Sequence, residues 1–85
     1  MDSAVALQYP KDKEAPVIAA KETGYLARRM VQIAQENNIP VVQDQMLESV
    51  LSVQEIGQCI PEHTWYAVAA IFASIARMEK DRGKV

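Results

Sequence analysis

Cysteine, histidine and long apolar runs are scarce in this 85-residue sequence, and each shortage excludes a class of protein. The single cysteine, Cys59, rules out an internal disulfide and any multi-cysteine metal site. His63 is the only histidine, so the ligand set of a zinc centre is missing. No run approaches the roughly 18 apolar residues that span a bilayer, and no signal segment opens the chain. We therefore expect no metal, no cofactor and a reducing compartment.

An excess of charge of one sign is also lacking. The 9 basic and 11 acidic residues are mixed along the chain and give a net charge of −2. No basic cluster combines with aromatic residues, which argues against nucleic-acid binding. Apolar residues make up 49% of the chain, which is ample for a globular core. A chain of this length forms one core, so we expect a single domain over residues 1–85, with flexible ends at 1–3 and 81–85.

Three segments have the composition of β-strands. Ala4–Tyr9 is small and apolar, and it ends at Pro10, which donates no ladder hydrogen bond. The charged turn Lys11–Glu14 separates it from a second strand at Pro16–Ala20, which is rich in β-branched residues. Ile39–Val42 has the composition of a third, short strand.

Apolar spacing predicts three helices between and after these strands. The first is expected from an N-cap at Thr23 to a stop at Asn37-Asn38. Its core face is predicted to contain Leu26, Met30, Ile33 and Ala34, with Tyr25 and Ala27 beside them.

The second helix is expected at Gln45–Ser52, where Asp44 caps it. It should bury Met46, Leu47, Val50 and Leu51. A turn region at Gln54–Ile60 follows, in which Gly57 is a candidate for a positive φ.

The last helix should have Pro61 in its first turn, with Glu62 complementing the positive helix end, and should run to about Lys80. Its apolar stripe is Trp65, Val68, Ala69, Phe72, Ile75 and Ala76, widened by Ile71.

This order of elements predicts an α/β fold, with a small mixed β-sheet of about three strands surrounded by three to four helices. The sequence of strand, helix and strand between residues 16 and 42 implies a right-handed parallel crossover.

The same segments resemble the cytoplasmic domain of FlhB and its relatives YscU and SpaS, the export switch proteins of flagellar and injectisome type III secretion. The likeness covers nearly the whole chain, and the order and spacing of its pieces are more specific than any one of them. It is carried by Ala4–Tyr9, Ala15–Ile18, Ala20-Lys21, Tyr25–Ala27, Ile33-Ala34, Glu36–Val42, Glu55–Gly57, Ile60–Glu62 and Tyr66–Ala69.

Two departures from the family pattern bear on function. In the family an Asn-Pro-Thr-His motif, where the chain cuts itself, directly precedes the segment that matches Ala4–Tyr9. Here Met1, Asp2 and Ser3 stand where the end of that motif would fall, so cleavage by that route is not expected. Further along, Gln45–Ser49 replaces a proline, leucine, alanine and arginine series, so contacts that the family makes there need not be shared.

Each residue that invites a catalytic interpretation also has an ordinary structural one. Cys59 and His63, four residues apart, would suit a small thiol enzyme or hydrolase, but a small buried thiol and a surface histidine explain them more simply. The pairs Asp44 with Glu48 and Glu55 with Glu62 are better explained as capping and surface charge. We therefore expect no enzymatic activity.

Two features point to protein partners instead. In the parent domains a strand upstream of the cleavage motif stays in the sheet, so the resemblance implies that the first strand here borders an unfilled position. Unpaired strand edges recruit other chains, or they are shielded by a nearby loop such as Lys11–Glu14. The candidate partner-binding residues at this edge are Ala4, Val5, Ala6, Leu7, Tyr9 and Lys21.

Aromatic residues of the last helix are the second feature. Trp65 and Phe72 lie on one helical face, and Tyr9 ends the first strand. Core packing is the ordinary explanation, and an exposed aromatic patch for a partner is the alternative.

The resemblance implies an interaction module of flagellar or other type III protein export, acting in substrate recognition or in the switch between substrate classes. Its partners would be apparatus components, exported substrates or a second copy, and it would work in the cytoplasm, at the inner face of the bacterial membrane. The alternative is a small cytoplasmic regulator or adaptor that keeps the fold outside any export apparatus.

Overall fold

The computed structural model describes residues 2–82 of the chain. Its elements are strands β1 (Ser3–Gln8) and β2 (Val17–Thr23), helix α1 (Gly24–Glu36), helix α2 (Gln45–Leu51), a short 3-10 helix η1 (Glu62–Thr64) and helix α3 (Trp65–Arg82). The α/β class expected from the sequence is confirmed.

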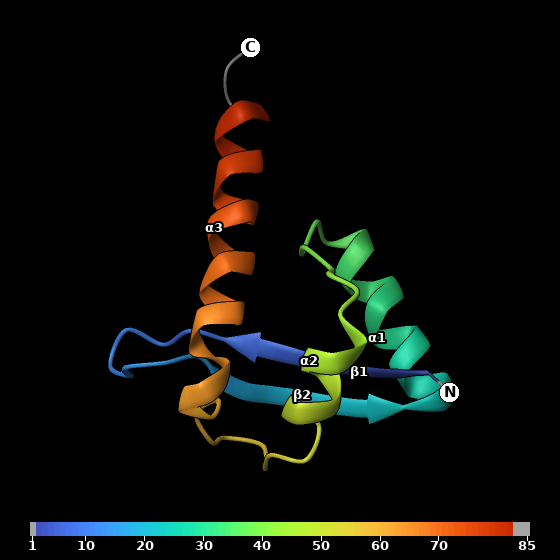
Figure 1. The fold of residues 1–85 in the computed structure, drawn as a ribbon. Coiled ribbons are helices and arrows are strands. Elements are labelled where there is room, and N and C mark those ends of the chain that lie inside the picture. The colour runs from blue at the N-terminus through green and yellow to red at the C-terminus, as the bar shows by residue number, and fades with distance from the viewer. Residues whose placement is uncertain (1, 83–85) are drawn as a thin grey trace.

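The two strands form an antiparallel hairpin that organises the rest of the molecule (Figure 1). In the register, Ser3 lies opposite Thr23, and Leu7 lies opposite Ile18, with a bulge after Ala6. The helices α1 and α3 rise from opposite ends of the hairpin, and α2 lies between them (Figure 1). The charged turn expected at Lys11–Glu14 lies in the exposed loop between the strands, where the Lys13 N–H donates to the Pro10 carbonyl at 3.3 Å.

The expected third strand at Ile39–Val42 is wrong, and so is the parallel crossover. The sheet of the described residues has two strands, both antiparallel, and residues 39–42 are exposed coil. The edge of β2 away from β1 is occupied instead by the segment before η1. There Ile18 donates to the Gln58 carbonyl at 2.9 Å and accepts from the Gly57 N–H at 2.8 Å, and Ile60 donates to the Pro16 carbonyl at 2.9 Å.

The backbone explains why this pairing segment looked like a turn in the sequence. Gly57 has φ 92, which confirms the positive φ predicted for it. The chain therefore turns sharply just before it runs beside β2. Only one bridge, Val17 opposite Cys59, results. A pairing this short carries no alternation of apolar residues that a sequence pattern could detect.

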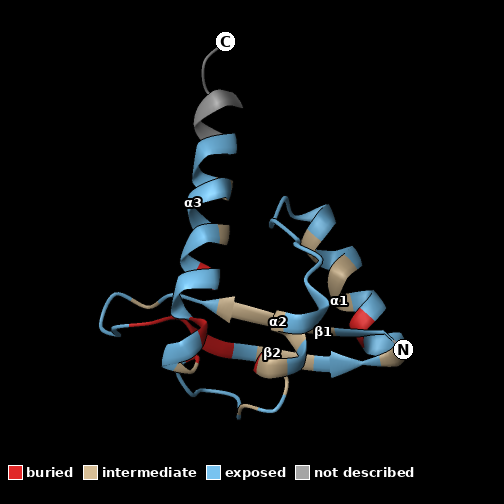
Figure 2. Ribbon diagram, viewed as in Figure 1, coloured by how far each residue is buried: buried red, intermediate tan, exposed pale blue. Residues whose placement is uncertain are grey.

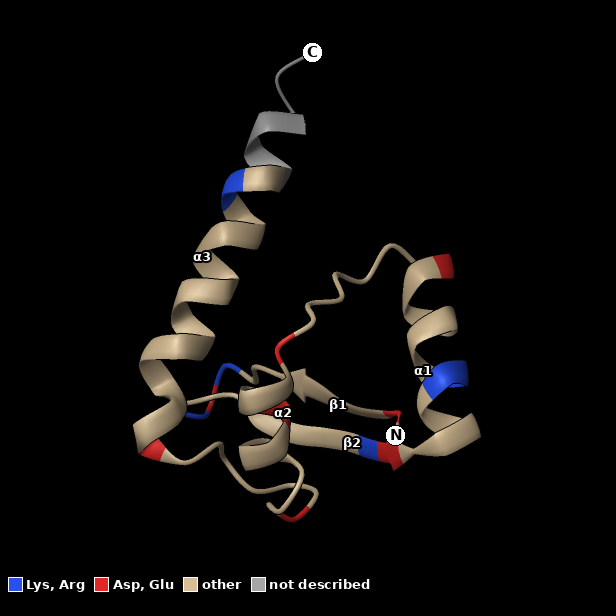
Figure 3. Ribbon diagram, turned by 45° about the vertical axis from the view of Figure 1, so that its right-hand side comes forward, with Lys and Arg blue, Asp and Glu red and all other residues tan. Residues whose placement is uncertain are grey.

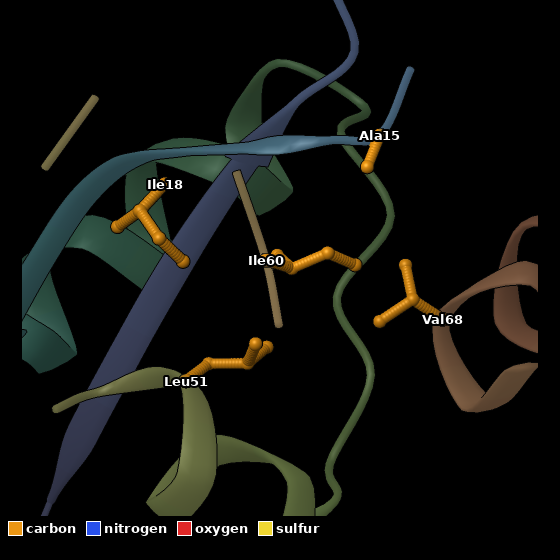
Figure 4. Packing of buried hydrophobic residues seen from close by; sticks show 5 residues of the cluster. All are labelled: Ala15, Ile18, Leu51, Ile60 and Val68. Carbon is orange, nitrogen blue, oxygen red and sulfur yellow. The ribbon is translucent and has the colours of Figure 1, made fainter. Parts of the chain in front are cut away.

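The core is small and lies where β2, α2, the segment before η1 and α3 meet. Ile18 is fully buried, and the cluster around it consists of Ala15, Leu51, Ile60 and Val68. Figure 4 shows Ile18, Leu51 and Ile60 pointing toward a common centre, with Val68 approaching from α3. Val5, Leu7 and Leu47 pack against this cluster while half-buried. Most of the other residues, including much of α3, are exposed (Figure 2).

Helix α1 buries only part of the face expected from its apolar spacing. Ala27 is the buried residue of this helix, while Leu26 is 54% exposed and Ile33 is 44% exposed. Met30, Val31 and Ala34 are half-buried. Helix α1 contacts both strands of the hairpin, and the apolar pattern alone does not show which of its faces does so.

The predicted helix ends agree with the structure better than the predicted core face of α1 does. Thr23 occupies the N-cap of α1, but its side chain makes no capping bond. Asp44 caps α2 as expected, because its Oδ1 accepts from the Leu47 N–H at 3.0 Å. Asn38 has φ 59, the left-handed conformation expected after α1.

Two further expectations about burial are corrected. Met46 of α2 is 81% exposed, while Leu51 is buried and Leu47 and Val50 are half-buried. Cys59, expected to be a buried thiol, is exposed, although it lies opposite Val17 of β2.

Candidate functional site

An apolar groove lies between the loop that joins β1 to β2 and the first two turns of α3. Its volume is about 190 Å³. The groove is lined by Tyr9, Glu14, Ala15, Pro16, Ile60, Trp65, Val68, Ala69 and Phe72.

The floor of the groove is the outer side of the core. Ala15, Ile60 and Val68 belong to the buried cluster, and each is at most 3% exposed. Pro16 is buried beside them. Because these residues are fixed by core packing, the floor is rigid and apolar.

Three aromatic side chains form the rim. The rings of Tyr9 and Phe72 stack with centroids 6.5 Å apart and an interplanar angle of 29°. The Tyr9 hydroxyl donates to the Glu14 carbonyl at 3.2 Å, and the Trp65 Nε1 donates to the Ile60 carbonyl at 3.2 Å. These bonds satisfy the polar atoms of two rings and fix the orientation of both.

The rim aromatics are neither core residues nor free surface residues. Tyr9 is 56% exposed, Trp65 38% and Phe72 37%. Trp65 and Phe72 are therefore packed only in part, and part of each ring is open to solvent.

The free edge of β1 is a second feature of this surface. The Gly24 N–H donates to the Asp2 carbonyl at 2.8 Å. In an antiparallel pair the direction of the backbone groups alternates, so the N–H and C=O of Ser3, Val5 and Leu7 point away from β2. Among residues 2–82, no backbone hydrogen bond reaches these outward groups.

The residues proposed from the sequence as partner contacts therefore separate into three environments. Ala4, Val5, Ala6 and Leu7 lie in β1, whose outer edge accepts no further strand within residues 2–82. Tyr9 belongs to the groove. Lys21 lies opposite Val5, and its Nζ donates to the carbonyls of Gln54 at 2.6 Å and Ser52 at 3.2 Å, which ties α2 to β2.

Sequence reasoning identified Val68 of the groove floor but missed Ala15, Pro16 and Ile60. Ala15 and Pro16 were assigned to the end of a loop and the start of a strand, and Ile60 to a turn. The signal that could have found them is the apolar pair Ala15-Pro16 before β2 together with Ile60-Pro61 before the last helix. Only the fold shows that these two short segments meet.

Titratable groups do not gather at a catalytic centre in the described part of the chain. No group of three histidine, cysteine, aspartate or glutamate side chains is placed to hold a metal ion there. His63 is exposed on η1. The Arg28 guanidinium, 2.6 Å from Asp2, lowers the pKa of that carboxyl, and both side chains are exposed. Acidic positions alone mark the ribbon from the end of α1 to the start of α3, and the basic positions lie in the hairpin, in α1 and further along α3 (Figure 3).

No helix among residues 2–82 combines the length and apolar character needed to cross a bilayer.

This arrangement of hairpin and helices is the fold of type III secretion C-terminal domains. The crystal structure of the PscU C-terminal domain matches with a TM-score of 0.77 at 29% identity, over 87% of this chain and 96% of that one. A mutated EscU/SpaS C-terminal domain matches with a TM-score of 0.78, over 85% of this chain and 91% of that one. At 24% identity, the second match supports the fold alone.

Sequence comparison identifies the family. The model described as the FlhB HrpN YscU SpaS family matches residues 1–75, and the chain belongs to this family. The flagellar biosynthetic protein FlhB of Helicobacter pylori is 38% identical over 82 residues, and FlhB of Escherichia coli is 39% identical over 80 residues. The matches cover 95% and 92% of this chain, but only 23% and 21% of those proteins. YlqH of Bacillus subtilis is 30% identical, and the match covers 91% of this chain and 84% of YlqH.

Proposed function

We propose that this domain is a non-enzymatic interaction module of flagellar or related type III protein export, and that its groove binds apolar segments of export substrates. The observation that carries the proposal is a preformed groove with a core-packed floor and half-exposed aromatic walls. Family membership supports the export context.

The size and chemistry of the groove favour a short peptide segment as the occupant. A volume of about 190 Å³ suits one or two apolar side chains rather than a large ligand. Aromatic residues with fixed orientation are the side chains that most often dominate the energy of protein interfaces. An extended chain that inserts such a side chain would bury Trp65 and Phe72 further against the floor.

The open edge of β1 offers a second way of holding an extended partner. The outward N–H and C=O groups of Ser3, Val5 and Leu7 can pair with a strand of another chain, and the small neighbours Ala4 and Ala6 permit close approach. The partner on this edge would be an apparatus component, an exported substrate or a second copy. Replacing Val5 with proline removes one outward donor, while the ladder to β2 runs through Ala4 and Ala6.

In this role the domain acts in the cytoplasm, at the inner face of the bacterial membrane where export substrates arrive. It contributes to substrate recognition or to the switch between substrate classes. A regulator or adaptor outside any export apparatus is the competing function, and it predicts no preference for export substrates.

A binding experiment with purified proteins tests the groove. The wild-type domain and the Phe72→Asp variant would be titrated with flagellar export substrates of Helicobacter pylori and with a non-exported protein of similar size. Tyr66→Asp is the matched control, because Tyr66 lies on α3 but is 88% exposed and does not line the groove.

We expect wild type and Tyr66→Asp to bind substrates with similar affinity. Phe72→Asp should bind about tenfold or more weakly, because it places a charge at an apolar contact. Equal affinity of all three variants would remove the groove from the proposal, and equal affinity for exported and non-exported proteins would favour the regulator. Val5→Pro in the same assay, with light scattering to detect self-association, tests the strand edge.

A further inference from the structure

Helix α3 is apolar on every side over its first part but packs against the domain on one side only. Residues 65–76 contain no charged side chain. Within this stretch Val68 is buried, Ile71 and Ile75 are half-buried on the same side, and the other residues are exposed. The helix stands away from the hairpin and from α1 along most of its length (Figure 1). Because a helix that is apolar all round is normally covered on every side, its outer face indicates a partner.

The outer face of α3, opposite Val68, carries Tyr66, Ala70, Ala73 and Arg77. Their intervals of four, three and four residues keep these side chains on one line along the helix. Tyr66 is 88% exposed, and the other three residues are exposed as well. The α3 residues that line the groove lie on a neighbouring side of the helix.

We propose that a second copy of this chain covers the outer face of α3, with the two α3 helices packed antiparallel about a two-fold axis. A two-fold contact requires a surface that is complementary to itself. This face meets that requirement, because Ala70 with Ala73 and Tyr66 with Arg77 are two pairs centred on the same point of the helix. When Ala70 lies opposite Ala73 of the second copy, Tyr66 therefore lies opposite its Arg77, and each pair occurs twice.

The opposed side chains are complementary in size and charge. Alanines at the centre allow the two helix axes to approach to about 8 Å, the lower end of the usual range. The Arg77 guanidinium then lies over the ring of Tyr66, which attracts a cation. Glu62 of η1 lies one turn before Tyr66, is exposed, and adds a charge opposite to that of the incoming guanidinium. No lysine or arginine occurs in residues 30–76, so no like charge opposes this approach.

The size of the contact predicts a weak, reversible dimer. One pair of helices buries less than the roughly 1,200–2,000 Å² of a standard stable interface. We therefore expect a dissociation constant of about 0.1–1 mM. The groove stays uncovered in this dimer, so the proposal goes beyond the groove and does not rest on it.

Sedimentation equilibrium of the full chain between about 0.02 and 2 mM tests the association. Wild type should change from monomer to dimer over this range. Tyr66→Arg should weaken association about tenfold or more, because it places a second guanidinium opposite Arg77. Tyr25→Arg is the matched control, since it makes the same change at a tyrosine of α1 that is 69% exposed, and it should dimerise as wild type does. Adding Arg77→Glu to Tyr66→Arg should restore the dimer, because opposite charges then face each other again.

Cysteine crosslinking tests the antiparallel register. In a Cys59→Ser background, a mixture of the Ala70→Cys and Ala73→Cys chains should form a disulfide-linked heterodimer faster than either chain forms a homodimer. Faster linking of Ala70→Cys to itself would indicate parallel helices and overturn the proposal. So would a wild type that stays monomeric at about 2 mM, or a dimer that Tyr66→Arg does not weaken. Phe72→Asp, which alters the groove, should dimerise normally, so failure here is distinguishable from failure of the groove.

Discussion

Ile18 is the residue on which the core depends most. Its side chain is 0% exposed, and it lies among Leu51, Ile60 and Val68, which come from three other parts of the chain. Its backbone also joins β2 to the segment before η1 through two hydrogen bonds. In a domain with so few buried residues, single contacts of this kind are a large part of the total stability.

We expect Ile18→Val to lower the free energy of unfolding by about 0.5–1.5 kcal/mol, because it removes one buried methylene from a packed site. Ile33→Val is the same chemical change at a side chain that is 44% exposed, and it should change stability by about 0.5 kcal/mol or less. Urea unfolding of both variants measures the difference. A larger loss at Ile33 would mean that α1 buries the face predicted from its apolar spacing.

The ion pair of Asp2 with Arg28 predicts a pH dependence of its own. The guanidinium lowers the pKa of the Asp2 carboxyl in the folded chain, so the ionised form is favoured by folding. Its contribution to stability is present above the unfolded pKa of about 4 and is lost as the pH falls through the lower folded value.

The melting temperature of wild type should therefore exceed that of Asp2→Asn near neutral pH, and the two should converge once the pH falls below the folded pKa of Asp2. The difference is expected to be small and to shrink with added salt, because both side chains are exposed. Asp12→Asn, in the exposed loop between the strands, controls for a general charge effect. A difference between wild type and Asp2→Asn that persists unchanged in acid would contradict the assignment.

At the scale of elements, the hairpin and the helices were predicted from the sequence. The segment that pairs with the other edge of β2 was not. Small and β-branched residues, a charged turn, an Asp44 cap and left-handed Asn38 are all local signals, and each is found in the structure. The third strand at Ile39–Val42 was predicted from composition alone. Strand pairing is a long-range event, and β2 instead pairs with Gly57–Ile60, which has one bridge and no periodic pattern.

Amide hydrogen exchange tests this arrangement directly. The N–H groups of Ile18, Gly57 and Ile60 donate within the pairing beside β2 and should exchange slowly. The amides of Val41 and Val42 make no backbone hydrogen bond within residues 2–82 and should exchange at nearly the rate of an unfolded peptide. Protection at Val41 and Val42 would show that this segment pairs with another strand in solution.

The face of a helix that meets the core is the other limit of sequence reasoning at this scale. The pattern assigned Leu26 and Ile33 to the core because they are large and apolar. The structure instead buries Ala27, whose small side chain contributes little to an apolar pattern. Single exposed apolar residues such as Leu26 and Ile33 are common on protein surfaces, so the sequence alone does not show which apolar residues of the helix are exposed.

At the scale of the whole molecule, the family and the α/β class were accessible from the sequence, and the groove was accessible only in part. Trp65, Phe72 and Tyr9 were identified as aromatic residues with two possible roles. Their convergence over a floor of Ala15, Ile60 and Val68 depends on contacts between segments more than 40 residues apart in the sequence. Contacts between distant segments produce no regular spacing of residues, so a single sequence does not reveal them.

The central claim is that this domain meets exported proteins through the groove. Site-specific photo-crosslinking in cells with a flagellar system tests it most directly. A photoreactive side chain would replace Ala69, which lines the groove, and in a separate strain Tyr66, which lies outside it on the same helix. We predict crosslinks to flagellar export substrates from position 69 and not from position 66, as identified by mass spectrometry. The same products from both positions, or none containing an exported protein, would contradict the account.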